Sequence, residues 1–251
     1  MNALAGRRIV VTRPAAQAGP LLAALAAAGA EAIAFPVLQI LPAADPGPAA
    51  RELAAVAPAD LTVFVSHNAA WHADRLRPLR ELPGTLLPIG AATAHTLASL
   101  GAQPAAATAE ATSEALLARP ALAPAAVAGR HVRIVRGNGG KPLLGDTLRQ
   151  RGARVTYVEV YRRAPVQPAP AALALWEGPV PDAVTATSAG VLDALMQLVT
   201  IPAQRRTLLA SRLVAVNSAM VKQARDYGFV HPPLLAASAH DRAVLAACRR
   251  L

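Results

Sequence analysis

The chain alternates short β-branched runs with alanine- and leucine-rich stretches at helical spacing. The run "RIVVT" is followed by "QAGPLLAALAAAG", "LTVFVS" by "NAAWHADRL", and "LLPIG" by "AATAHTLASLG". Strands that alternate with helices in this way are typical of parallel sheets with helices packed on them. The pattern therefore predicts an α/β protein.

The second half of the chain repeats the first in three segments of the same order. Arg13, after the first run, matches Arg136 at a distance of 123 residues. The segment "ADLTVFVSHNA" matches "PDAVTATSAGV" at 122 residues, and "IGAATAHTLASLG" matches "VNSAMVKQARDYG" at 127 residues. Each match is weak because alanine-rich α/β segments look alike, but three similar offsets in series indicate a duplication.

The extended runs "AFPVLQILP" and "YVEVYRRAPV" follow the first segment of each repeat. Their β-branched and proline residues favour extended backbone, as expected of paired linkers between two domains. We therefore predict a first domain from residues 1–36 and 167–251, a second from residues 40–162, and linkers near 36–40 and 159–166. Contiguous halves are the alternative. Either arrangement predicts a cleft between two similar domains, beyond the carboxyl ends of their strands.

The apolar content and the net charge of the chain indicate which kind of partner it binds. The hydrophobic fraction of 54% with only 3% aromatic residues reflects alanine, and Gly29, Glu31 and Pro36 interrupt the most apolar stretch, so we expect no membrane span. The net charge of +10 predicts an acidic partner. Few aromatic residues lie among the arginines, which disfavours nucleic acid and favours a polyanionic small molecule. A solvated arginine-rich surface is the alternative explanation.

The cysteine content and the N-terminus indicate a compartment. Cys248 is the single cysteine, which excludes an internal disulfide and a cysteine-rich metal site. The N-terminus reaches a strand-like run too early for a signal peptide, so we expect a cytoplasmic protein. The six histidines show no metal-binding spacing, and we expect no metal.

Small or hydroxylated residues end each strand-to-helix turn, as in "TRP", "SHN", "GAAT", "RGNGG", "TSAG" and "NSA". Free amides at helix starts bind anions, although such residues also serve simply as helix caps. In a basic protein, two matched sets of turns favour a cleft with several anion contacts. The candidate contacts from these turns are Arg13, Ser66, His67, Asn68, Arg136, Gly137 and Lys141. For His67, an ordinary surface histidine is the alternative.

The stretch "IVRGNGGKPL" does not have the spacing of a phosphate-binding loop. Lys141 is followed by Pro142 instead of a hydroxyl residue, which argues against a nucleotide-dependent transferase. Its glycines allow close approach of a ligand to the backbone. Tyr161 lies in the second linker beside Arg162 and Arg163, where a phenol could donate a proton into the cleft or simply pack across the sheet.

The ordered set "VTRPAAQ", "GAEAIAFPVLQI", "FVSHNAA", "IGAATAHTL", "ATSEALL", "RGNGGKPLLGDTLRQRGARV", "VYRR" and "TSAGVL" resembles the uroporphyrinogen-III synthase family over nearly the whole chain. The resemblance implies two flavodoxin-like domains joined by a two-stranded linker, with the first domain built from both chain ends. It also implies a lyase of heme biosynthesis that works without a cofactor. That enzyme dehydrates and cyclises hydroxymethylbilane, a polycarboxylate, to uroporphyrinogen III with inversion of ring D.

The resemblance assigns roles to matching positions. Tyr161 is the candidate general acid, and Ser66, Thr93 and Ser188 match hydroxylated positions in the family's cleft. Ser113, in "ATSEALL", is a further candidate contact. The turn "VNSAMVKQA" departs from the family pattern of a glycine followed by threonines, so Ser218 and Lys222 are the candidates to replace a lost hydroxyl there.

The expected partners are hydroxymethylbilane and, transiently, hydroxymethylbilane synthase, with no nucleic acid, no membrane and a monomeric state. The competing function is a two-domain protein that closes on an anionic ligand without chemistry.

Overall fold

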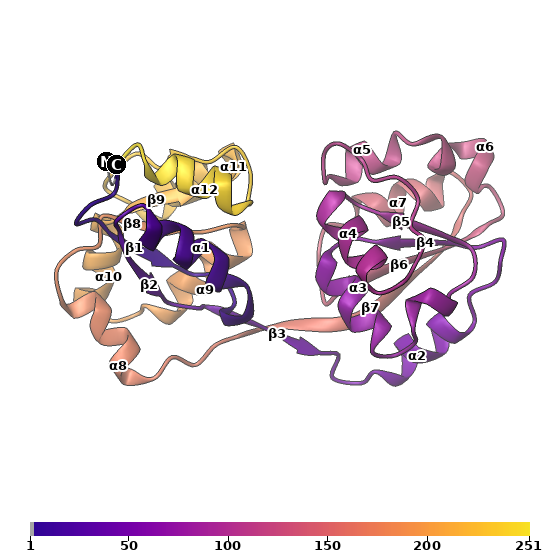
Figure 1. Cartoon of the computed structure of the whole chain (residues 1–251), viewed down its shortest axis with the longest axis horizontal. Coiled ribbons are helices and arrows are strands. Elements are labelled where there is room, and N and C mark those ends of the chain that lie inside the picture. Colours follow the sequence, from indigo (N-terminus) through magenta and orange to yellow (C-terminus); the bar gives the residue numbers. More distant parts are fainter. Residues whose placement is uncertain (1–2) are drawn as a thin grey trace. The chain divides into compact units, whose positions relative to one another are not determined.

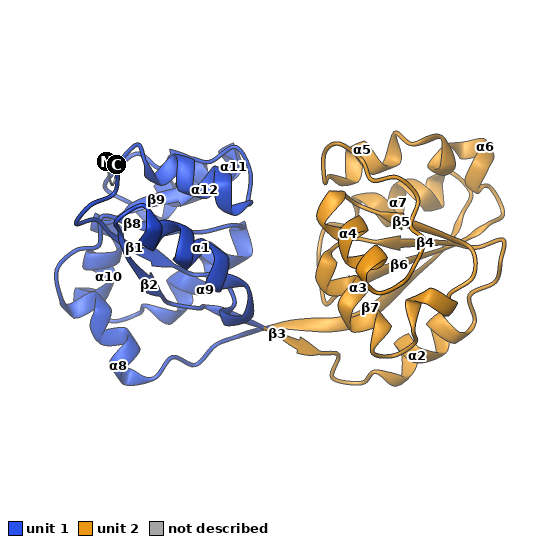
Figure 2. Cartoon of the chain, in the orientation of Figure 1, with its two compact units in different colours: residues 1–39, 164–251 blue, residues 40–163 orange. Residues whose placement is uncertain are grey.

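The computed structural model describes residues 3–251, in which the β-branched runs form two five-stranded sheets (Figure 1). The chain divides into two compact units (Figure 2). Unit 1 takes the residues up to 39 and those from 164 to 251, and unit 2 takes residues 40–163. The chain therefore crosses from one unit to the other twice.

The sheet of unit 1 has the order β10-β9-β8-β1-β2, and its neighbouring strands are parallel. Numbered along unit 1, this is the order 2-1-3-4-5 of doubly wound sheets read from the other edge. Its strands are β1 (Arg8–Val11), β2 (Glu31–Ala34), β8 (Ala183–Thr185), β9 (Arg212–Ala215) and β10 (Leu234–Leu235).

Helices cover both faces of this sheet. Ile9 and Val11 pack with α1 and α12, whereas Val10 points to the other face, toward α9, α10 and α11. Residues on both faces of the strands are apolar because a parallel sheet is buried on both sides. The helices of unit 1 are α1 (Ala15–Ala27), α8 (Pro170–Leu173), α9 (Ala189–Leu198), α10 (Pro202–Ala210), α11 (Ser218–Tyr227) and α12 (Asp241–Cys248), with a 3₁₀ turn at Ala174–Glu177.

The sheet of unit 2 has the order β3-β7-β6-β4-β5, with β7, β6, β4 and β5 parallel. Leu86 also forms an isolated parallel bridge with Pro104 beyond β5. The order β7-β6-β4-β5 in unit 2 corresponds to β2-β1-β8-β9 in unit 1, so the matched segments of the duplication take the same places in both sheets. The strands are β3 (Leu38–Pro42), β4 (Leu61–Phe64), β5 (Thr85–Pro88), β6 (His131–Gly137) and β7 (Arg154–Pro165).

Helices also cover both faces of the second sheet. Apolar residues of α2, α3 and α4 form one core with Phe64 and Val135, and those of α5, α6 and α7 form the other with Val63 and Ile134. The helices are α2 (Gly47–Ala54), α3 (His67–Asp74), α4 (Ala91–Ser99), α5 (Ser113–Leu117), α6 (Pro124–Val127) and α7 (Leu143–Gln150), with 3₁₀ turns at Leu79–Glu81 and Pro120–Leu122.

The two extended runs expected to be linkers form β3 and the long strand β7, which are neighbours in the second sheet. The N–H of Val166 donates to the carbonyl of Val37 at 3.1 Å, and the N–H of Ala43 donates to that of Val160 at 3.3 Å. The partner numbers fall as the chain numbers rise, so these strands are antiparallel. Within residues 3–251, no helix is long and apolar enough to cross a membrane.

Candidate active site

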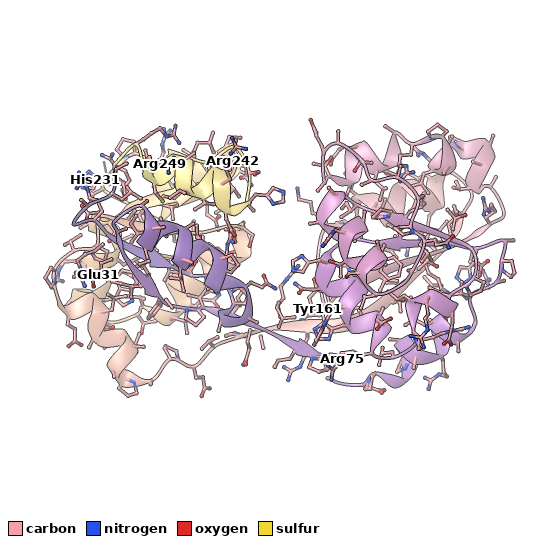
Figure 3. All side chains as sticks on the ribbon, in the orientation of Figure 1. Glu31, Arg75, Tyr161, His231, Arg242 and Arg249 are labelled. Atoms are coloured by element: carbon pink, nitrogen blue, oxygen red, sulfur yellow. The ribbon has the colours of Figure 1, made fainter. Side chains whose placement is uncertain are left out.

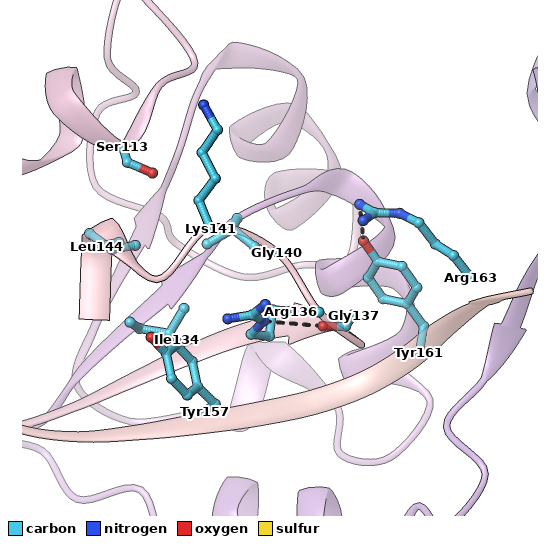
Figure 4. A pocket seen from close by; sticks show the side chains of 12 residues that line it. Ser113, Ile134, Arg136, Gly137, Gly140, Lys141, Leu144, Tyr157, Tyr161 and Arg163 are labelled. Atoms are coloured by element: carbon cyan, nitrogen blue, oxygen red, sulfur yellow. Dashed lines mark hydrogen bonds between the residues drawn. The ribbon is translucent and has the colours of Figure 1, made fainter. Parts of the chain in front are cut away.

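A cavity of about 200 Å³ lies in unit 2 at the carboxyl end of β6 (Figure 4). Open parallel sheets bind ligands beyond the carboxyl ends of their strands. The cavity walls come from β6, the loop into α7, the first turn of α7, β7, the residue after β4 and the first residue of α5. The lining residues are Val65, Ser113, Ile134, Arg136, Gly137, Gly139, Gly140, Lys141, Leu144, Tyr157, Tyr161 and Arg163.

The loop between β6 and α7 has a backbone that only glycine adopts readily. Gly139 and Gly140 have φ angles of 70° and 118°. A Cβ atom added at Gly140 would lie 2.7 Å from Nη2 of Arg136, so the glycine also makes room for that guanidinium. Across residues 3–251, the N–H groups of Gly139, Gly140 and Lys141 donate to no backbone carbonyl. They can therefore donate to an anion in the cavity.

Arg136 is held in place by an aromatic ring. Its guanidinium lies 4.7 Å from the centre of the Tyr157 ring, and its Nε donates to the carbonyl of Gly137 at 3.2 Å. Arg149 lies 5.1 Å from the same ring. Neither Arg136 nor Lys141 forms an ion pair with any residue in the described part of the chain. Both cations therefore remain available for a carboxylate ligand.

Tyr161, which Figure 3 marks among the side chains of the whole chain, places its phenol at the other side of the cavity (Figure 4). The residue is buried, and Nη2 of Arg163 donates to its Oη at 3.1 Å. Oη also lies 3.3 Å from Oγ of Ser66. Since an arginine can only donate, Oη accepts the bond from Arg163 and keeps its own proton for Ser66 or for a ligand. The Arg163 cation would stabilise the phenolate that remains after proton transfer.

The cavity is positively charged on three sides. Arg136, Lys141 and Arg163 line it, and the described lining residues include no aspartate or glutamate. Of the residues predicted from the sequence, Ser113, Arg136, Gly137, Lys141 and Tyr161 meet at this cavity. This arrangement can hold an acidic ligand and donate a proton to it.

Four other predicted residues of unit 2 do not line the cavity, although Ser66 contacts Tyr161, which does. Ser66 caps α3, because its Oγ accepts from the N–H of Ala69 at 3.0 Å. His67 and Asn68 follow in the first turn, and the loss of solvent around the ring lowers the pKa of His67. Thr93 is buried in α4.

Three of the four predicted residues of unit 1 have partners within that unit. Arg13 forms an ion pair with Asp241 and also donates to the carbonyl of Ala239. Ser188 caps α9, and Lys222 pairs with Asp226 at 2.8 Å. Ser218 is the first residue of α11, which Asn217 caps. Substrate contacts at these four residues stay predictions.

Sequence reasoning assigned no substrate contact to Tyr157 or Arg163, which also line the cavity, whereas Gly139 and Gly140 belong to the stretch whose glycines were expected to allow a ligand close to the backbone. A signal for Arg163 was present, because side chains two residues apart point to the same face of a strand, and Tyr161 is two residues away. The same alternation places Tyr157, four residues before Tyr161, on that face of an uninterrupted strand, so Tyr157 also carried a signal. The pairing of β6 with β7 shifts in register between Arg136 and Gly137. This shift interrupts the regular alternation of side chains between the two faces of β7 from Tyr157 to Tyr161.

Comparisons with known proteins place this geometry in context. The family model described as uroporphyrinogen-III synthase HemD matches residues 20–236. The chain is 33% identical over 227 residues to uroporphyrinogen-III synthase of Escherichia coli (strain K12), covering 88% of this chain and 92% of that protein.

Two solved structures are similar in fold. A variant of uroporphyrinogen III synthase from the extremely thermophilic bacterium Thermus thermophilus has a TM-score of 0.63 at 20% identity, with 98% of each chain covered. Uroporphyrinogen-III synthetase from Helicobacter pylori 26695 has a TM-score of 0.61 at 13% identity, with 96% of this chain and 97% of that one covered. At these identities, the two structures establish an α/β fold rich in parallel sheet.

Proposed function

The chain belongs to the uroporphyrinogen-III synthase family, a family of lyases in tetrapyrrole biosynthesis, and from that membership we propose how its own residues carry out the reaction. The substrate is hydroxymethylbilane, which is dehydrated and closed to uroporphyrinogen III with inversion of ring D. The relatives are named as synthases, so the competing function, binding of an anionic ligand without catalysis, is not favoured.

One observation supports the site assignment most strongly. Tyr161 Oη lies in a cavity with three cations, and Arg163 already donates to that oxygen. Hydroxymethylbilane carries a carboxylate on every side chain, so Arg136 and Lys141 have groups to bind. Charge-assisted hydrogen bonds of this kind are about twice as strong as neutral ones.

In the proposed reaction, Tyr161 protonates the hydroxyl group as its bond to carbon breaks. The pyrrole nitrogen supplies the electron pair, and water leaves an azafulvenium ion. The substituted carbon of the terminal ring attacks this ion and forms a spiro intermediate. The bond from that carbon to its original methylene bridge then breaks and leaves a second azafulvenium ion on the neighbouring ring. The unsubstituted α-carbon of the terminal ring bonds to this ion and loses its proton to the Tyr161 phenolate, which the Arg163 cation stabilises until then.

Control of substrate conformation is the other task of the site. Hydroxymethylbilane also closes without an enzyme, and that closure gives the uninverted type I isomer. An enzyme must hold the chain so that the substituted carbon reaches the azafulvenium ion first. The cations and the free amides of the Gly139–Lys141 segment are suited to hold carboxylates in one arrangement.

The finer domain assignment belongs to the same proposal. Two flavodoxin-like domains joined by a two-stranded linker are supported by the matched strand orders and by the antiparallel strands β3 and β7. The expected cleft between domains stays a prediction. So do the transient contact with hydroxymethylbilane synthase, the monomeric state and the cytoplasmic location.

The test is to supply freshly made hydroxymethylbilane and to separate the porphyrin isomers after oxidation. The wild-type protein should give type III product, and type I alone would refute the proposed function. Tyr161→Phe should lower kcat for type III about a hundredfold, since a positioned general acid contributes 10²–10⁴-fold. The matched control is Tyr227→Phe in unit 1, whose hydroxyl bonds to Asp193 and which should keep the wild-type isomer ratio. Unchanged turnover of Tyr161→Phe at saturating substrate would remove Tyr161 from the acid role.

A further inference from the structure

Two residues from different elements lie against the ring of Tyr161. The ring of His72 in α3 has its centre 5.5 Å away, with the two planes at 26°. At Gly137, at the end of β6, an added Cβ atom would come within 2.4 Å of the Tyr161 ring. Both neighbours are buried, so the ring has little room to move.

We propose that His72 and Gly137 are positioning residues for Tyr161 and hold its phenol between Ser66 and Arg163 at the edge of the cavity. This inference rests on the proposed function, because it takes Tyr161 as the proton donor. In this proposal, both residues act by holding Tyr161 and not by contacting the substrate.

Helix α3 supports the tyrosine at two points. Its cap residue Ser66 lies 3.3 Å from Tyr161 Oη, and His72, less than two turns later, stacks on the ring. Trp71 meets the His72 ring edge to face at 4.8 Å, and Arg75 lies 4.8 Å from the Trp71 ring. The stack therefore continues from the site to the surface, where Trp71 is 48% exposed.

The contribution of His72 comes from its flat ring. Burial and then the positive charge of Arg75 lower its pKa, so the ring is neutral at pH 7 and above. A neutral aromatic pair is worth about 0.5–1.5 kcal/mol beyond its buried area. Phenylalanine can supply the same stacking, whereas leucine fills a similar volume without a flat face.

The contribution of Gly137 comes from the space it leaves. Its φ angle lies outside the left-handed region, so its backbone accepts any residue. The added Cβ would lie 2.4 Å from Cε2, 2.5 Å from Cζ and 2.9 Å from Cδ2 of Tyr161. An alanine would therefore push the tyrosine ring away from the strand, and its hydroxyl away from Arg163.

The test is a double-mutant cycle on type III formation. His72→Leu should lower kcat about threefold to tenfold, because the free energy of an aromatic pair corresponds to a rate factor of that size. KM should stay within about twofold, since Arg136 and Lys141 are unchanged. His72→Phe should recover most of kcat. In the Tyr161→Phe background, His72→Leu should cause no further loss.

Gly137→Ala provides a second route that does not depend on how well His72→Leu folds. It should lower kcat at least as much as His72→Leu and, in the Tyr161→Phe background, should add less than about twofold. The matched control is Gly190→Ala in α9, where an added Cβ meets no atom within 4 Å. Thermal unfolding of every variant, followed by circular dichroism, checks that each is folded at the assay temperature.

The outcomes separate this inference from the function on which it rests. If His72→Leu and Gly137→Ala lower kcat by the same factor with and without the Tyr161 hydroxyl, they do not act through it and the inference is wrong. If His72→Phe is as slow as His72→Leu, ring stacking is not the cause and the inference is also wrong. If Tyr161→Phe alone keeps full turnover, the acid assignment fails and the inference fails with it. If the wild-type protein forms only type I product, the proposed function itself is refuted.

Discussion

Arg13 and Arg136 occupy matched positions of the duplication, yet the two units use them differently. In unit 1, Arg13 follows β1 and forms an ion pair with Asp241 at the start of α12. In unit 2, Arg136 lies near the end of β6 before the loop, stacks on Tyr157 and faces the cavity without an acidic partner among the described residues. The same element of the fold thus supplies a structural cation in one unit and a ligand-facing cation in the other.

The loops after these two strands also differ, and again only the loop of unit 2 is suited to bind a ligand. The turn after β1 places Pro14 directly before α1 and contains no glycine. The turn after β6 contains Gly139 and Gly140 in backbone conformations that favour glycine, and its amides from Gly139 to Lys141 donate to no backbone carbonyl among residues 3–251. Duplication preserved the strand order, whereas the residues at the strand ends diverged. We infer that unit 2 supplies the charged contacts to substrate and the proton donor.

The largest effect that would test this comparison is expected for Arg136→Gln. A hydrogen bond to a charged group contributes about 1.5–3 kcal/mol, so kcat/KM should fall about tenfold to a hundredfold. Arg13→Gln should chiefly lower the free energy of unfolding, by about 1 kcal/mol, because it removes an ion pair inside unit 1. Steady-state kinetics and urea unfolding of both variants are the measurements.

Ionic strength provides the control for Arg136→Gln. Salt screens partly exposed charges, so KM of the wild-type protein should rise with salt and that of Arg136→Gln should rise less. An equal loss of kcat/KM in Arg13→Gln would show that the two units share the binding of carboxylates and would contradict the comparison.

The two aspartates of a second matched pair, Asp60 and Asp182, should differ in how much each contributes to the free energy of unfolding. Burial raises the pKa of Asp60, but the N–H of Ala57 and the charge of Arg133 outweigh it, and the pKa lies below 3.8. The pKa of Asp182 is likewise raised by burial and lowered, by more, by the N–H of Arg8 and by Arg7. Because both folded pKa values are depressed, this stabilisation is present above about pH 4 and is lost as pH falls through the folded values.

The burial of the arginine partner decides which aspartate matters more. Arg133 is 3% exposed, whereas Arg7 is 45% exposed. Asp60→Asn should therefore lower the free energy of unfolding by about 2 kcal/mol and Asp182→Asn by less than about 1 kcal/mol. Urea unfolding between pH 7 and pH 3 measures both values, and the pH dependence should flatten more in Asp60→Asn. Equal losses would mean that the two ion pairs are equally exposed in solution.

Much of the fold could be predicted from the sequence because its signals are local. The run "LTVFV" became β4, and the glycine-rich loop after β6 lies between a strand and a helix as its composition suggests. The partners of side chains could not be predicted in this way. Asp241 is 228 residues from Arg13, and His72 reaches Tyr161 because α3 packs on the sheet at β6, the neighbour of β7. Such contacts depend on tertiary packing, for which no periodicity in the chain gives a signal.

The smallest expected difference concerns the two lysines predicted to bind substrate. Lys141 lines the cavity in unit 2, whereas Lys222 in unit 1 is 79% exposed and paired with Asp226 one helical turn away. An exposed charge contact contributes about 0.2–1 kcal/mol, so Lys141→Gln should raise KM about twofold to fivefold. Lys222→Gln should raise KM by less than Lys141→Gln, because its charge is already balanced within α11. Steady-state kinetics at low salt measures both variants. A larger KM increase for Lys222→Gln would mean that the ion pair with Asp226 opens when substrate binds, and unit 1 would then contribute a charged contact after all.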